Sequence, residues 1–203
     1  MPDKVNRSGR QLRYSTTRFE ARTDDTGPVI AGYFAVFDSE YRMGANAIEK
    51  IAKGAFSSSL GGDVRALIDH VTHLVLGRTV AGTFTLREDD HGLYGEIRIN
   101  EHDSDAMNLY ARVQRGDVNQ CSIGFDIVRE DYIVSEDGQT CTWIIREVIL
   151  YEGSVVTFPA YEATSVEARA ADSAATLQKT RMERRKNDLI ERIKRNAENH
   201  DAP

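Results

Sequence analysis

The chain has 203 residues, a length that suits one domain of ordinary size with an appendage. Its hydrophobic share of 40% is modest and its charged share of 29% is high, so we expect some segment to stay outside the core. The formal net charge is −6, although residues 179–195 hold eight Lys or Arg against three Asp or Glu. The rest of the chain is therefore acidic, which argues against a nucleic-acid-binding body.

The sequence holds no apolar run of 18 residues, and its N-terminus is polar throughout, so we expect neither a membrane span nor a signal peptide. Cys121 and Cys141 have neither the spacing of metal ligands nor the count of a secreted disulfide framework. We therefore expect two reduced thiols in a cytosolic protein, with no metal and no cofactor.

Most of the chain shows the pattern of β structure. Residues 1–16 are expected to form a flexible N-terminal segment, and beyond them runs of β-branched and aromatic residues between Gly, Pro and Asp predict strands. The expected elements are a strand over 29–41, a short helical turn over 47–56, a strand over 63–70, a hairpin over 77–99 and a long hairpin over 121–158. This order predicts a mainly antiparallel β domain with one or two packed helices.

One helix is well marked, over residues 103–118. Asp103 or Ser104 can cap its start, and Gly116 is placed to end it. Its apolar positions fall three or four residues apart, at Ala106, Leu109, Tyr110 and Val113. We expect this face to pack on the β domain.

The C-terminal part changes in composition to Ala, Glu, Arg and Lys. We place the β domain at residues 17–165 and a charged helical tail at 166–203, with a helix expected over 173–198. Its apolar positions are sparse, so it buries little surface alone. A partner-binding appendage and a solvated helix both fit this pattern.

The chain offers a serine and several histidines that suit acyl transfer. A serine hydroxyl needs a base within hydrogen-bond reach, and five histidines are present. His70 ends an apolar run where the chain leaves the predicted strand, which is a favourable place for a general base, while His73 shares the following loop. The other three histidines are expected at the surface as solvated imidazoles: His91, His102 and His200.

Ser122 begins the apolar run of the second hairpin and is the candidate nucleophile. Cys121 is a rival, but neighbours on a strand point to opposite faces, so only one of the two can meet His70. An oxyanion hole would use backbone N–H groups, and the candidates are the glycines at 61–62 and 124 and the segment 77–79.

A carboxylate for the base depends on the register of the second hairpin. A three-residue loop with Gly138 in the left-handed conformation puts Ser122 opposite Glu152. A two-residue turn moves Glu152 to the other face unless a bulge, for which Gly153 is the candidate, intervenes. Glu147 is the rival acid, on the face away from Glu152 in an unbroken strand.

Several motifs in order resemble the prohead proteases of tailed phages. They are GYFAVF, KGAF, a strand ending in His70 with Gly77-Arg78-Thr79 after it, HGLYGEIRI, a helix ending in RGDV, QCSIGF and LYEGSVVTFPAY. The likeness runs from about residue 17 to 165. Most relatives follow the histidine with Asp, where this chain has Val71, and they usually have a β-branched or aliphatic residue where this chain has Gly153.

The resemblance implies a fold and a function. The family is similar to herpesvirus assemblins, which implies an antiparallel β-barrel flanked by helices and a serine endopeptidase with His70 as base, Ser122 as nucleophile and Glu152 as third member. It implies cleavage of the major capsid protein's scaffold segment, and of the protease itself, inside the procapsid in the host cytoplasm. We also expect self-association, with no membrane or specific nucleic-acid partner. A non-enzymatic assembly factor that binds capsid protein through its basic tail is the alternative.

Overall fold

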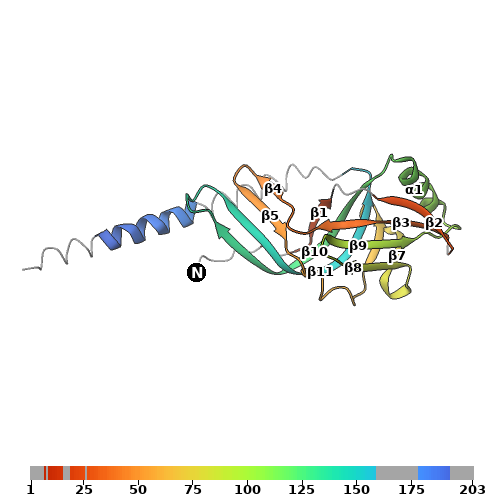
Figure 1. The fold of residues 1–203 in the computed structure, drawn as a ribbon, viewed down its shortest axis with the longest axis horizontal. Helices are drawn as coiled ribbons and strands as arrows, with labels where there is room; N and C mark the ends of the chain where they lie inside the picture. The colour runs from red at the N-terminus through yellow and green to blue at the C-terminus, as the bar shows by residue number, and fades with distance from the viewer. Residues whose placement is uncertain (1–6, 8, 16–18, 26, 159–177, 193–203) are drawn as a thin grey trace, which may run out of the picture.

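The computed structural model describes residues 7, 9–15, 19–25, 27–158 and 178–192 (Figure 1). Within these ranges the chain is mainly β, with one packed helix, α1 (Ser104–Arg115), one short 3₁₀ turn, η1 (Thr79–Ala81), and a C-terminal helix over 178–192. The strands are β1 (Gln11–Ser15), β2 (Glu20–Asp24), β3 (Gly27–Val36), β4 (Tyr41–Gly44), β5 (Ala47–Ile51), β6 (Arg65–Ile68), β7 (Val71–Arg78), β8 (Phe84–Glu88), β9 (Gly92–Arg98), β10 (Gln120–Val134) and β11 (Cys141–Val156).

The described strands form two sheets. A seven-stranded sheet has the order β1-β10-β11-β5-β4. In the same sheet β6 pairs with the C-terminal part of β11, and β7 pairs with β6. A four-stranded sheet has the order β2-β3-β9-β8. The pairs of β11 with β5 and with β6 are parallel, and the other pairs are antiparallel. The expectation of an antiparallel barrel is therefore corrected. Among the described strands neither sheet closes on itself, because the length of β11 lets it pair with two short parallel strands in succession.

One apolar cluster joins the two sheets and α1. It includes Phe34 from β3, Ile97 from β9 and Phe125 from β10, all nearly inaccessible to solvent. The helix behaves as its pattern predicts: Asp103 accepts hydrogen bonds from the N–H groups of Asp105 and Ala106, and its four periodic apolar residues are buried. Gly116 ends it in the left-handed conformation at a φ of 86°.

Three expectations about local structure change. Residues 47–51 form β5 instead of a helical turn, because parallel pairing with β11 prevails over local propensity. The strand expected over 29–41 is β3 and ends at Val36, since Asp38 takes a φ of 55° and turns the chain. The loop expected after His70 is strand β7.

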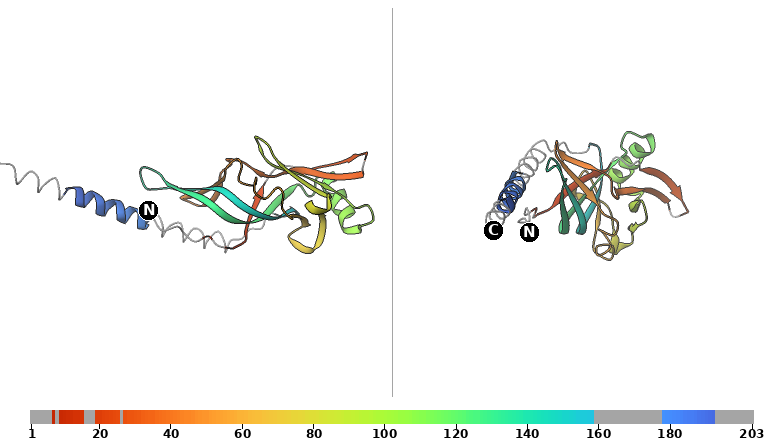
Figure 2. Two further views of the ribbon diagram at one scale, coloured as in Figure 1. Left: turned by 90° about the horizontal axis from the view of Figure 1, so that it is seen from below. Right: turned by 60° about the vertical axis from the view of Figure 1, so that its left-hand side comes forward.

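The N-terminal segment and the tail are described only in part. Residues 11–15, expected to be flexible, form strand β1 on the edge of β10. Of the helix expected over 173–198, residues 178–192 are helical and the remainder lies outside the described residues. Figures 1 and 2 show this helix beyond the tip of the β10–β11 hairpin. None of the described helices is both long and apolar enough to cross a membrane.

Candidate active site

His70 lies on a two-residue turn between β6 and β7. Ile68 pairs with Val71, and the two turn residues, Asp69 and His70, have φ values of 47° and 61°. Positive φ at both positions is the conformation that joins antiparallel strands most tightly, and Asp and His tolerate it better than most residues. The fold therefore holds His70 on a rigid hairpin end.

The end of β11 fixes this turn. Asp69 donates its N–H to the carbonyl oxygen of Val155 at 3.0 Å. Its carboxylate accepts hydrogen bonds from the N–H of Thr157 at 2.7 Å and from the Thr157 hydroxyl at 3.0 Å. These contacts offset the cost of a strained turn and set the position of the next residue, His70.

The imidazole of His70 is held by a buried carboxylate. His70 Nδ1 lies 2.6 Å from Glu152 Oε1, and the other carboxylate oxygen, Oε2, accepts a hydrogen bond from Ser154 Oγ at 2.6 Å. The Ser154 hydroxyl in turn accepts a hydrogen bond from the backbone N–H of His70 at 3.3 Å. Because an ionised carboxylate only accepts hydrogen bonds, the proton of a neutral His70 sits on Nδ1 and the lone pair on Nε2.

Ser122 lies on β10, next to the part of β11 that carries Glu152 and Ser154. It is opposite Ser154 in the register of β10 and β11, and Glu152 is opposite Gly124, so all four share one face of the sheet. Ser122 Oγ and His70 Nε2 are among the buried side-chain polar atoms of the described residues that have no hydrogen-bond partner. Buried polar atoms are rarely left unpaired, and this pair combines a hydroxyl donor with an imidazole acceptor.

A β-bulge brings Glu152 to the face of Ser122. Near the turn, Val134 pairs with Cys141, which is the register that would send Glu152 to the opposite face. The register shifts between Gly124 and Phe125, where Tyr151 is the extra residue. The bulge is thus at Tyr151 and not at Gly153, and Ser122 faces Ser154 instead of Glu152.

Two glycines make room for this arrangement. A Cβ on Gly124 would lie 2.5 Å from Glu152 Oε1, so only glycine leaves space for the carboxylate there. A Cβ on Gly153 would lie 2.7 Å from Phe34 Cδ1, because the ring of Phe34 fills the space that an aliphatic side chain would take.

The rival residues lie elsewhere. Cys121 points to the other face and donates its thiol to the carbonyl oxygen of Tyr33 at 3.2 Å. Glu147 is partly exposed and lies 3.7 Å from Arg129. His73 is exposed on β7, His91 and His102 are exposed, and His200 lies outside the described residues.

Three features of the site were not predicted from the sequence: Ser154, Tyr14 and the contact between Asp69 and Thr157. Ser154 follows Glu152 by two residues, so strand alternation could have placed it on the same face. The position of Tyr14 opposite Ser122 had no signal, because β1 was expected to be flexible.

A histidine held by a carboxylate, and a serine with an unpartnered hydroxyl on the same face of the strand pair as that carboxylate, are the groups that serine hydrolases use. The chain belongs to the family described as caudovirus prohead serine protease, which matches residues 15–179. The prohead protease of Enterobacteria phage HK97 is 28% identical over 179 residues, covering 87% of this chain and 74% of that protein. The chain is a protease of phage capsid maturation.

The fold has a solved counterpart. The structure of the bacteriophage T4 capsid assembly protease, gp21, superposes with a TM-score of 0.51 at 13% identity, covering 76% of this chain and 100% of that one. At this identity the likeness concerns the fold alone.

Proposed function

We propose that the chain is a serine endopeptidase in which Ser122 is the nucleophile, His70 the general base and Glu152 the residue that orients His70. The shared face of β10 and β11 carries this proposal, because Ser122 Oγ lies buried there without a hydrogen-bond partner and Glu152 of the same face contacts His70. The 2.6 Å contact of His70 Nδ1 with Glu152 supports it, because it fixes the lone pair on Nε2.

The reaction is acyl transfer in two steps. Ser122 Oγ forms a bond to the carbonyl carbon of the peptide while its proton passes to His70 Nε2. The C–N bond then breaks, and His70 returns the proton to the leaving amine. Water repeats the sequence on the acyl-enzyme, which releases the carboxylic acid and restores Ser122. Glu152 stabilises the positive charge of the imidazolium in both steps.

The substrates we propose are segments of the major capsid protein and its scaffold, together with the protease itself, inside the procapsid. The family assignment and the names of the two similar proteins support this choice. Self-association of the chain is part of the same proposal, since a protease needed in one place gains from activation by neighbouring copies. We also propose that the site is arranged as in the assemblins of herpesviruses.

The test is intact mass over time for the wild-type chain beside Ser122→Ala at high concentration. Fragments that appear only in the wild type establish Ser122-dependent proteolysis and reveal the cleavage sites. Co-expression with the capsid protein extends the test to the proposed substrate. If both chains and the capsid protein stay whole, and a fluorophosphonate leaves Ser122 unlabelled, the proposal fails and the assembly-factor alternative gains.

A further inference from the structure

The nucleophile proposed above is closed off in this structure. Ser122 has no solvent-accessible surface, and the backbone of Tyr14 on β1 lies directly opposite it. The ring of Tyr14 meets the imidazole of His70 edge-on at 6.0 Å between centroids. A protein substrate has to bring its carbonyl carbon to Ser122 Oγ, so this arrangement cannot bind one in a reactive position.

β1 occupies the edge of the strand that carries Ser122. In the order β1-β10-β11, one edge of β10 is taken by β11 and the other by β1. An extended peptide commonly binds a protein by adding a strand to such an edge. The place that β1 fills is therefore the place where a peptide could lie beside Ser122.

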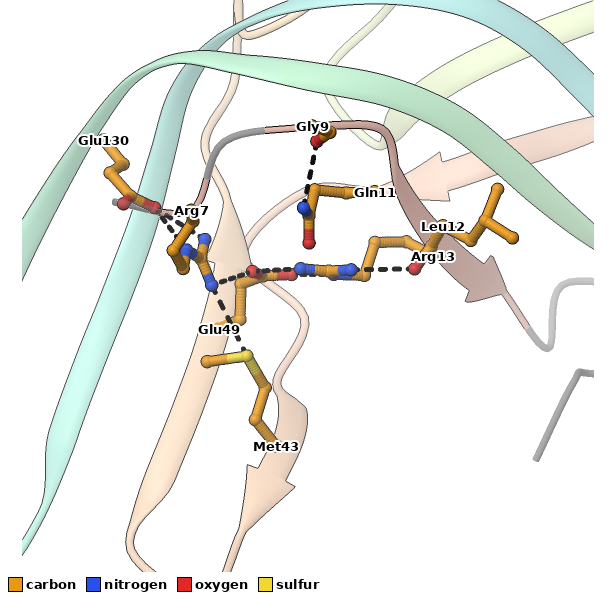
Figure 3. Close-up of polar contacts among 8 residues, drawn as sticks. All are labelled: Arg7, Gly9, Gln11, Leu12, Arg13, Met43, Glu49 and Glu130. Carbon is orange, nitrogen blue, oxygen red and sulfur yellow. Dashed lines mark hydrogen bonds and ion pairs between the residues drawn. The ribbon is translucent and has the colours of Figure 1, made fainter. Parts of the chain in front are cut away.

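Charged contacts hold the N-terminal segment, which consists of Arg7 and residues 9–15. Arg7 donates to Glu49 Oε2 at 2.7 Å and to Glu130 Oε2 at 2.6 Å, and Arg13 donates to Glu49 Oε2 at 2.6 Å (Figure 3). The guanidinium of Arg10 lies 4.5 Å from the ring centre of Tyr151.

Glu49 is the centre of this attachment. Its burial favours the neutral acid, but the charge and hydrogen bonds of Arg13, and then of Arg7, outweigh burial and hold the pKa of Glu49 below its ordinary value. Glu49 is therefore ionised, and it needs the arginines of the N-terminal segment as long as it stays buried.

The rest of the domain does not depend on β1 for its core. None of the residues of β1 belongs to the apolar cluster that joins the sheets and α1. The family match begins at residue 15, so Gln11–Tyr14 lie outside the part of the chain that the family shares. The contact of β1 with the cluster is made by Arg13, whose guanidinium lies 5.7 Å from the ring centre of Phe125.

We propose that β1 fills the binding site of an extended peptide substrate beside Ser122, and that the N-terminal segment formed by Arg7 and residues 9–15 must leave before the protease acts. The proposal rests on the role of Ser122 as nucleophile. It assigns the edge of β10 as the substrate site and the N-terminal segment as its internal occupant.

The first test measures how fast a fluorophosphonate labels Ser122 in the full chain. Labelling forms the Oγ–P bond and expels fluoride, and it requires β1 to open. Arg7→Ala removes two ion pairs of the segment while Arg13 still neutralises Glu49, so we expect labelling about ten-fold faster. The matched control is Arg22→Ala, which breaks the ion pair with Glu96 on the four-stranded sheet and is expected to label at the wild-type rate. Equal rates in all three chains overturn the proposal.

The second test removes residues 1–15 and replaces Glu49→Gln, so that the charge of the nearly inaccessible Glu49 is not left unpaired. Circular dichroism checks that the shortened chain is folded. We expect it to be labelled faster than full-length Glu49→Gln; a folded shortened chain that is labelled no faster overturns the proposal. If the shortened chain does not fold, β1 is part of the folded core, which also counts against it. Absence of labelling in every chain instead rejects Ser122 as the nucleophile.

Discussion

Two stretches of the β10–β11 hairpin differ in what their polar residues do. At the open end, Ser122, Glu152 and Ser154 are buried between neighbouring strands, and Glu152 and Ser154 contact His70. Near the middle of the hairpin, by contrast, Arg129 and Glu147 form a partly exposed ion pair. One pair of strands therefore contains a buried polar site and a partly solvated ion pair, and the neighbours of each stretch decide which it becomes. Polar groups in the first environment are worth far more to the protein than those in the second.

The largest effect is expected at the base. His70→Ala removes the proton acceptor of Ser122 and should lower kcat by about 10⁴-fold or more. His73→Ala changes an exposed histidine of the neighbouring strand and should leave kcat unchanged. Rates of cleavage of a scaffold-derived peptide measure both, and equal losses would move the base to His73.

The same substitution in the two stretches of the hairpin tests the comparison directly. Glu152→Gln keeps the shape of the side chain but lets the imidazole take the wrong tautomer, so we expect kcat to fall by about 10³- to 10⁴-fold. Glu147→Gln alters only the exposed pair with Arg129 and should change kcat by less than about two-fold. Comparable losses of kcat in the two variants would mean that Glu152 is not the residue that orients His70.

Ser154→Ala should have an intermediate effect. It removes the hydrogen bond to Glu152 Oε2 and leaves the His70 N–H without its acceptor, which costs about 1–3 kcal/mol. We expect kcat to fall about ten-fold or more with little change in KM, because the carboxylate that orients His70 is less well held. Ser154→Thr keeps the hydroxyl and is the matched variant. A loss of stability with an unchanged kcat would leave Ser154 a purely structural role.

The smallest effect is expected at the tip. Arg184 donates to the carbonyl oxygens of Ser135 at 3.3 Å and Glu136 at 3.1 Å, in an exposed contact between the C-terminal helix and the hairpin turn. Arg184→Ala should change the free energy of unfolding by about 0.5 kcal/mol or less and leave peptide cleavage intact. A large fall in thermal stability would show that the helix is integrated with the arm.

The parts of the fold set by local chemistry could be predicted from the sequence. The helix that begins after Asp103 and ends at Gly116 follows from its caps and its apolar spacing, and the second hairpin follows from two long β-rich runs around Gly138. Strand β5 was not recognised, because one of its two partners, β11, lies 94 residues further along the chain, as the pairing of Ala47 with Cys141 shows.

The site was only partly predictable for the same reason. His70 and Ser122 stand out by residue type at a strand end, and Glu152 was chosen on the resemblance. The contact of Glu152 with His70 depends on a bulge at Tyr151 that shifts the register by one residue, and nothing in the local pattern of Tyr151 marks it.

The Asp69–Thr157 contact has a consequence for timing. It joins the turn that carries His70 to residues 88 positions later, and the carboxylate for the imidazole comes 82 positions after it. Contacts so distant in the chain form late in folding and set a slow rate. During synthesis the ribosome must pass Thr157 before the turn that carries His70 can be fixed. Under the function proposed for His70, the long separation delays activity until the β domain has left the ribosome and folded.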